Sequence, residues 1–153
     1  MSTIEAGELL YEYEVKFTGI TEYGVSMESL VAGEIAPPPE GARIDVAFEG
    51  ESTGPKLKGT VTGVDYLRIR GDGQFQLHIH AEITMDDGEK IALFADGVAY
   101  PREGSNIADL RENATLTTSS KTYAWVNALQ IWATGTVDLA EQVVRIKGYS
   151  AYR

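Results

Sequence analysis

The sequence predicts an all-β protein whose strands close into one antiparallel, calycin-like barrel with at most one short helix. Three observations carry this prediction. Apolar and polar residues alternate along most of the chain, which is the pattern of strands with one buried face. Turn signals rich in glycine and aspartate, such as those at 71–73 and 86–88, separate these segments. The segments between the turns are long, which favours a barrel over a sandwich.

The predicted strands occupy most of the chain. Three long strands between 57 and 100 form a meander. The proline run at 37–39 has no backbone N–H groups to donate, so we expect it to end the extended segment before it. A turn at 49–51 is expected to end the strand before it. In chain order, the predicted strands are 9–17, 25–35, 44–48, 57–70, 74–85, 90–100, 114–118, 123–137 and 142–152.

Residues 101–113 are predicted to form a loop with one helical turn. Ser105 can cap that turn, which would run from Ile107 to Arg111. No composition shift or repeat divides the chain, and 153 residues is the usual size of one domain. We therefore expect a single barrel domain over 1–153.

The composition excludes several classes of protein. The absence of cysteine rules out disulfides, thiol nucleophiles and thiolate metal sites, and it fits a reducing compartment. The first twenty residues carry four glutamates and no continuous apolar segment, so they do not resemble a signal peptide. A net charge of −10 repels phosphates. We expect a cytoplasmic protein without nucleic-acid or membrane partners.

Several short motifs resemble a known family. They are 41–50, 54–61, 63–66, the hairpin end at 85–88, Gly97 and the segment 123–127. Their order and spacing resemble the bacterial and fungal family known as domain of unknown function 3237, from Gly41 to the C-terminus. The resemblance implies a calycin-type or allene-oxide-cyclase-like barrel, often packed as homo-oligomers, and no common activity. His78 and His80 stand where the family tends to place an acidic residue and an arginine.

Asp65 is the first candidate for chemistry. Strand alternation places it on the same face as Val61 and Leu67, which is otherwise apolar. A carboxylate there must be hydrogen-bonded, paired or protonated. One interpretation is a general acid or base in a barrel pocket. The other is a carboxylate that accepts backbone N–H bonds at the barrel rim beside Gly63, where the glycine would mark a bulge.

His78 and His80 are the only histidines in the chain, and at i and i+2 of a strand they point the same way. One of them can act as an acid or base if this face lines a pocket. The row that they form with Glu82 is a possible metal face, but a cupin-type site would need a further histidine. The third interpretation is a solvated polar strand face. We expect neither a metal nor a cofactor.

The remaining candidates would bind a ligand. Aromatic side chains can form the walls of an apolar pocket, although any β core of this size uses such residues too. An asparagine can orient a ligand carbonyl, and an arginine can bind a carboxylate or simply pair with a nearby glutamate. These candidates are Tyr11, Tyr13, Tyr123, Trp125, Asn127 and Arg43.

The sequence therefore predicts a barrel that binds a small organic ligand. If the protein is an enzyme, we expect cofactor-independent isomerase, cyclase or lyase chemistry, with Asp65 and one of His78 or His80 as acid and base. Trp125 and Asn127 would position the substrate. A non-catalytic carrier or sensor and a structural oligomerisation module remain open, because fold does not determine function.

Overall fold

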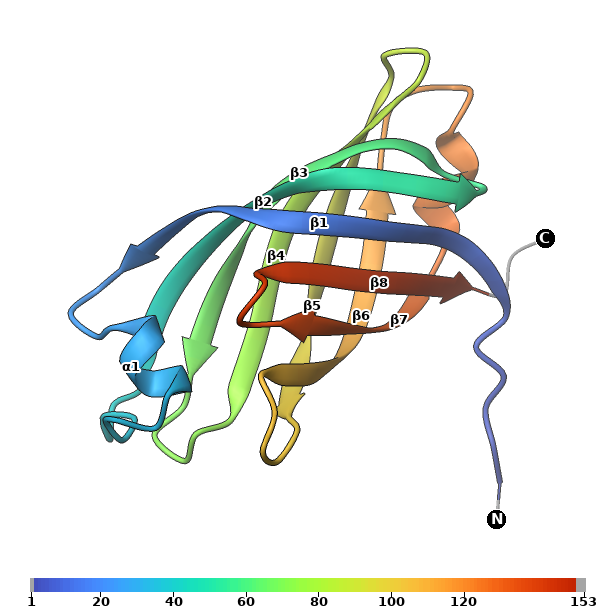
Figure 1. The fold of residues 1–153 in the computed structure, drawn as a ribbon. Coiled ribbons are helices and arrows are strands. Elements are labelled where there is room, and N and C mark those ends of the chain that lie inside the picture. The colour runs from blue at the N-terminus through green and yellow to red at the C-terminus, as the bar shows by residue number, and fades with distance from the viewer. Residues whose placement is uncertain (1, 151–153) are drawn as a thin grey trace.

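The computed structural model describes residues 2–150, which form a closed antiparallel barrel of eight strands (Figure 1). Each strand pairs with its neighbours in chain order, and the last strand closes the barrel on the first. This confirms the predicted all-β antiparallel barrel. The strands are β1 (Glu8–Glu22), β2 (Ala42–Pro55), β3 (Lys58–Ile69), β4 (Phe75–Met85), β5 (Lys90–Pro101), β6 (Ile107–Thr117), β7 (Ile131–Asp138) and β8 (Val143–Ser150). The described helices are α1 (Met27–Val31) and the 3-10 helix η1 (Ala124–Ala128).

The second strand is longer than predicted because its central glycine lies inside the sheet. Gly50 pairs with Val15 on β1 and with Val61 on β3. A Cβ atom at Gly50 would collide with the Glu14 carbonyl, so the missing side chain allows β1 to come close. The expected turn at 49–51 is therefore wrong, and the glycine continues the strand.

Helix α1 replaces the extended segment predicted at 25–35. The Oγ of Ser26 accepts a hydrogen bond from the Ser29 N–H at 3.2 Å. The carboxylate of Glu22 accepts another from the Met27 N–H at 2.6 Å. These two caps satisfy N–H groups that a helix start leaves without partners.

Two other predicted segments also differ from the structure. The predicted helical turn at 107–111 is the start of β6, because this segment pairs with β5 and β7. The Oγ of Ser105 accepts a hydrogen bond from the N–H of Ile107, the first residue of that strand, and caps no helical turn. The strand predicted at 123–137 starts only at Ile131, after η1. The predicted end of the last strand, at Tyr152, lies outside the described residues.

The two ends of the barrel are built differently. The end next to η1, here called the packed end, is filled by fully buried side chains such as Leu57, Val126 and Ile131. Tyr11 lies over Gly148, where a Cβ atom would collide with the tyrosine ring. The opposite end lies next to α1 (Figure 1). It contains a cavity and is here called the cavity end. Across residues 2–150, no helix combines the length and apolar character needed to cross a membrane.

Candidate active site

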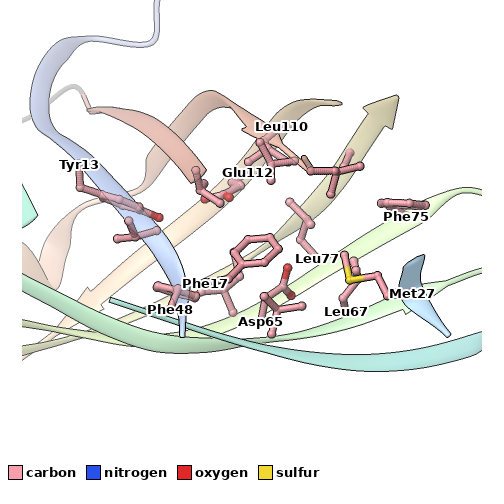
Figure 2. A pocket seen from close by; sticks show the side chains of 17 residues that line it. Tyr13, Phe17, Met27, Phe48, Asp65, Leu67, Phe75, Leu77, Leu110 and Glu112 are labelled. Carbon is pink, nitrogen blue, oxygen red and sulfur yellow. The ribbon is translucent and has the colours of Figure 1, made fainter. Parts of the chain in front are cut away.

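The cavity lies inside the barrel, and its wall is almost entirely apolar (Figure 2). The cavity has a volume of about 60 Å³. It is therefore suited to a compact ligand. All eight strands contribute at least one side chain to the wall, and Met27 of α1 and Leu139 complete it. The strand residues are Tyr13, Val15, Phe17, Val46, Phe48, Asp65, Leu67, Phe75, Leu77, Ile79, Ala99, Leu110, Glu112, Val137 and Val144.

Asp65 points into this cavity from β3 (Figure 2). Toward the cavity end it is followed on the inward face by Leu67 and Ile69, so it lies deep in the barrel. One carboxylate oxygen accepts a hydrogen bond from the His78 N–H at 3.0 Å. This bond occurs where the ladder between β3 and β4 is interrupted, between the pairs Asp65–Ile79 and Arg68–Gln76. The carboxylate does accept a backbone N–H, as the second interpretation expects, but Asp65 lies inside the barrel and Gly63 pairs regularly with Ala81, so the rim position and the bulge are wrong.

Glu112 enters the same cavity from β6. Two apolar inward residues, Ala108 and Leu110, precede it from the cavity end, which gives it the same place along its strand as Asp65 on β3. Its side chain is only 4% exposed. The Oε2 atom is buried without any hydrogen-bond partner, which is costly for a polar atom in an apolar environment.

The two carboxyl groups have different pKa values, and both values are raised by burial. Burial raises the pKa of Asp65 to about 6, although the hydrogen bond from His78 lowers it and the charge of Asp45 adds a little. Burial also raises the pKa of Glu112 to about 8, and repulsion from the Asp65 carboxylate contributes. The repulsion acts on Glu112 because Asp65 ionises first. At neutral pH the pair therefore holds one negative charge, on Asp65, and one proton, on Glu112.

Tyr13 completes the polar part of the wall. Burial, and then the charge of Glu112, raises the pKa of Tyr13 well above its usual value, so the phenol stays neutral. None of the described residues that line the cavity is a lysine, arginine or histidine. A bound anion would meet the Asp65 charge without any compensating cation, so the wall favours ligands without negative charge.

The structure places the predicted histidines away from this cavity. His78 and His80 are exposed on the outer face of β4, because the inward residues of that strand are Leu77, Ile79 and their alternates. Asp65 contacts the backbone of His78 and not its ring. The Asp65 side chain therefore lies on the inner face of the barrel wall, and the two histidine rings lie on the outer face.

Among the predicted ligand-binding residues, only Tyr13 lines the cavity. Tyr11 is buried at the packed end, and its ring stacks on Tyr13 at a centroid distance of 5.8 Å. Arg43 lies outside, in an ion pair with Asp45 at 2.8 Å. The rest are near η1, at the opposite end: Tyr123 donates to Asp87, Asn127 bonds the backbone of Thr118, and Trp125 is 36% exposed.

Glu112 was not among the residues selected from the sequence, although a signal for it exists. Ala108, Leu110, Ala114 and Leu116 alternate with polar residues, and Glu112 occupies the middle of this otherwise apolar face. The predicted helical turn at 107–111 concealed the alternation, because a helix would have placed these residues on different faces.

A family model described as "Protein of unknown function (DUF3237)" matches residues 25–151, and the chain belongs to this family. None of the curated proteins matches the sequence. Among solved structures, a protein of unknown function from Clostridium acetobutylicum is 20% identical, with a TM-score of 0.76 and coverage of 94% of this chain and 96% of that one.

Two further structures share the fold. A "beta-barrel like protein" from Acinetobacter baumannii is 20% identical, with a TM-score of 0.72 and coverage of 94% of this chain and 93% of that one. A protein from Penicillium herquei, described only as an enzyme, is 19% identical, with a TM-score of 0.60 and coverage of 97% and 98%. At these identities the likeness shows the fold alone.

Proposed function

We propose that this barrel is a cofactor-independent enzyme that moves protons on a compact, uncharged organic substrate, as an isomerase, cyclase or lyase. The observation that carries the proposal is the pair of buried carboxyl groups, Asp65 and Glu112, in one apolar cavity. Between pH 6 and 8 one of them is a carboxylate and the other a carboxylic acid. Pairs of titratable groups with pKa values pushed apart are the usual basis of acid–base assignments.

In this proposal Asp65 is the base and Glu112 is the acid. The Asp65 carboxylate takes a proton from an acidic C–H or O–H bond of the substrate. The Glu112 Oε2–H donates its proton to the carbonyl oxygen or leaving group that gains the electron pair. Two protons are transferred and charge is conserved, which leaves Asp65 protonated and Glu112 ionised. The pair is reset when Asp65 gives its proton to the product or to water and Glu112 takes one back from the product or from water. Tyr13, as a neutral phenol, can donate a further hydrogen bond to the same oxygen.

The buried Oε2 atom of Glu112 supports the presence of a ligand. A carboxyl oxygen without a partner is unfavourable, and a substrate oxygen at this place would remove the penalty. The enzyme from Penicillium herquei, a distant structure with the same barrel, adds weak support for catalysis. The apolar wall is also compatible with a second function, that of a carrier without turnover.

A Kemp elimination can test the proposal. The probe, 5-nitrobenzisoxazole, is compact and uncharged, and a base opens its ring by removing one C–H proton as the N–O bond breaks. We expect turnover that rises with pH around the Asp65 pKa of about 6. Asp65→Asn should lower the rate by about 100-fold or more, the usual effect of removing a general base. Glu82→Gln, which changes an exposed carboxylate paired with Lys90, should leave the rate unchanged.

Binding of the probe is followed separately, from shifts in the methyl NMR signals of cavity residues. Binding without turnover in the wild type would favour the carrier. Equal turnover in the wild type and in Asp65→Asn would contradict the assignment of Asp65 as the base. No binding of the probe, or of any uncharged compound of its size, would contradict the cavity as a ligand site.

A further inference from the structure

The two histidines form a cluster on the outer face of the barrel that the proposed acid–base site does not use. His78 and His80 alternate along β4, so both rings point outward and both residues are exposed. Their Nε2 atoms lie 3.2 Å apart, and their ring centroids are separated by 5.0 Å. Neutral imidazole nitrogen is the commonest protein ligand of metal ions, and here two such nitrogens converge.

Aromatic side chains on the neighbouring strands hold the two rings in place. The ring of Phe94, on β5, has its centroid 5.4 Å from that of His78 and 5.3 Å from that of His80. On the other side, Tyr66 on β3 lies 6.3 Å and 5.9 Å from the same two rings. The histidines are thus packed between two aromatic residues. Such support reduces the entropy lost when the rings are fixed by a ligand.

No other group competes for the ring nitrogens. Within residues 2–150, the rings of His78 and His80 form hydrogen bonds only with each other. The bond from His78 to Asp65 uses the backbone N–H and leaves the ring free to bind. The two nitrogens therefore do not have to break a salt bridge before they can hold an ion.

The spacing of the nitrogens suits a metal ion as well as a hydrogen bond. Zinc binds imidazole nitrogen at about 2.0–2.1 Å, and in a tetrahedral site two ligands are then separated by about 3.3 Å. Without an ion, the same spacing is that of one Nε2–H donating to the other Nε2. An ion can take the place of the shared proton once both ring nitrogens are turned toward it. We propose that His78 and His80 form a two-histidine site for a divalent first-row transition metal ion.

The remaining coordination positions would be filled by water. Glu82 is the next outward residue on β4, but its carboxylate is paired with Lys90 at 3.1 Å. Asp96, opposite His78 on β5, accepts a hydrogen bond from Asn113 at 2.9 Å. Among the described residues, no group of three potential ligands is close enough to share an ion. A site with two protein ligands binds weakly, and we expect Cu²⁺ to bind more tightly than Ni²⁺ or Zn²⁺.

Calorimetric titration of the untagged protein with CuCl₂, NiCl₂ and ZnCl₂ at pH 7.5 tests the site. We expect one saturable ion per chain, with Cu²⁺ the tightest. His78→Ala and His80→Ala should each weaken binding by about tenfold or more, because loss of even an outer partner of a metal ligand costs 10–100-fold. The alanine at 78 keeps the N–H that bonds Asp65, so the interior is preserved.

Two comparisons make the test decisive. Glu82→Gln is the control and should bind like the wild type, because that carboxylate is already paired. Circular dichroism establishes that the histidine variants are folded. Wild-type affinity in the double variant His78→Ala/His80→Ala would overturn the proposal, because binding would then come from other groups. An effect of only one of the two histidines, or no saturable binding in the wild type, would overturn it as well.

Discussion

The packed end and the cavity end use the same strands and the same alternation, yet one is solid and the other hollow. At the packed end large apolar side chains such as Leu116 and Ile131 are almost completely buried. At the cavity end the inward face includes two carboxyl groups, Asp65 and Glu112, that no described side chain neutralises. The comparison indicates that the packed end supplies the stability that allows the cavity end to hold costly groups.

A matched pair of substitutions on β6 tests this difference in packing between the two ends. Leu116 and Leu110 are the same residue type on the same inward face, on either side of Glu112. Leu116→Ala should lower the free energy of unfolding by about 3–5 kcal/mol, because it leaves a hole in a filled core. Leu110→Ala should cost about 2 kcal/mol, since Leu110 already borders the cavity and has fewer neighbours to lose. Urea unfolding measures both, and equal losses would contradict the comparison.

Glu112→Gln tests the cost of the buried carboxyl group. A pKa raised from 4.5 to about 8 means that the folded state holds this proton more tightly than the unfolded state. The stabilisation from this proton is complete below pH 4.5 and is lost as the pH rises through 8. At pH 9 the variant should be more stable than the wild type by a few kcal/mol, at about 1.4 kcal/mol per pKa unit. At pH 5 the two should be nearly equal.

The control for this experiment is Glu82→Gln on the outer face of β4. That side chain is exposed and paired with Lys90, so its removal should change stability little at either pH. A Glu112→Gln variant that is no more stable than the wild type at pH 9 would show that the Glu112 carboxyl group is hydrated or paired in solution.

The two ends also differ in how far the sequence could predict them. Alternation identified the barrel and placed Asp65 inward, because a strand period of two fixes the face of each residue. Alternation put His78 and His80 on one face of their strand but left open whether that face is inside, and the structure places the apolar face of β4 inside. Glu112 was hidden by the predicted helical turn at 107–111. Residues 107–111 form a strand because they pair with β5 and β7. Such pairing with distant segments cannot be recognised from the local sequence pattern.

The segment 123–129 shows the same limit. The sequence predicts that it belongs to a strand from 123 to 137, with Trp125 and Asn127 positioning a substrate. A short apolar segment does not distinguish a buried strand from another buried element. The structure uses it as η1 against the packed end, where Asn127 bonds the backbone of Thr118. The depth of the cavity and the missing partner of the Glu112 Oε2 depend on tertiary packing alone.

The most direct test of the account is a ¹³C NMR titration of the side-chain carboxyl groups. The acid–base pair requires that Asp65 and Glu112 titrate separately, near pH 6 and near pH 8. In Asp65→Asn, the Glu112 step should move to lower pH, because the repulsion is lost while the burial stays. Titration of both carboxyl groups below pH 5 in the wild type would contradict the central claim that the cavity holds one base and one acid at neutral pH.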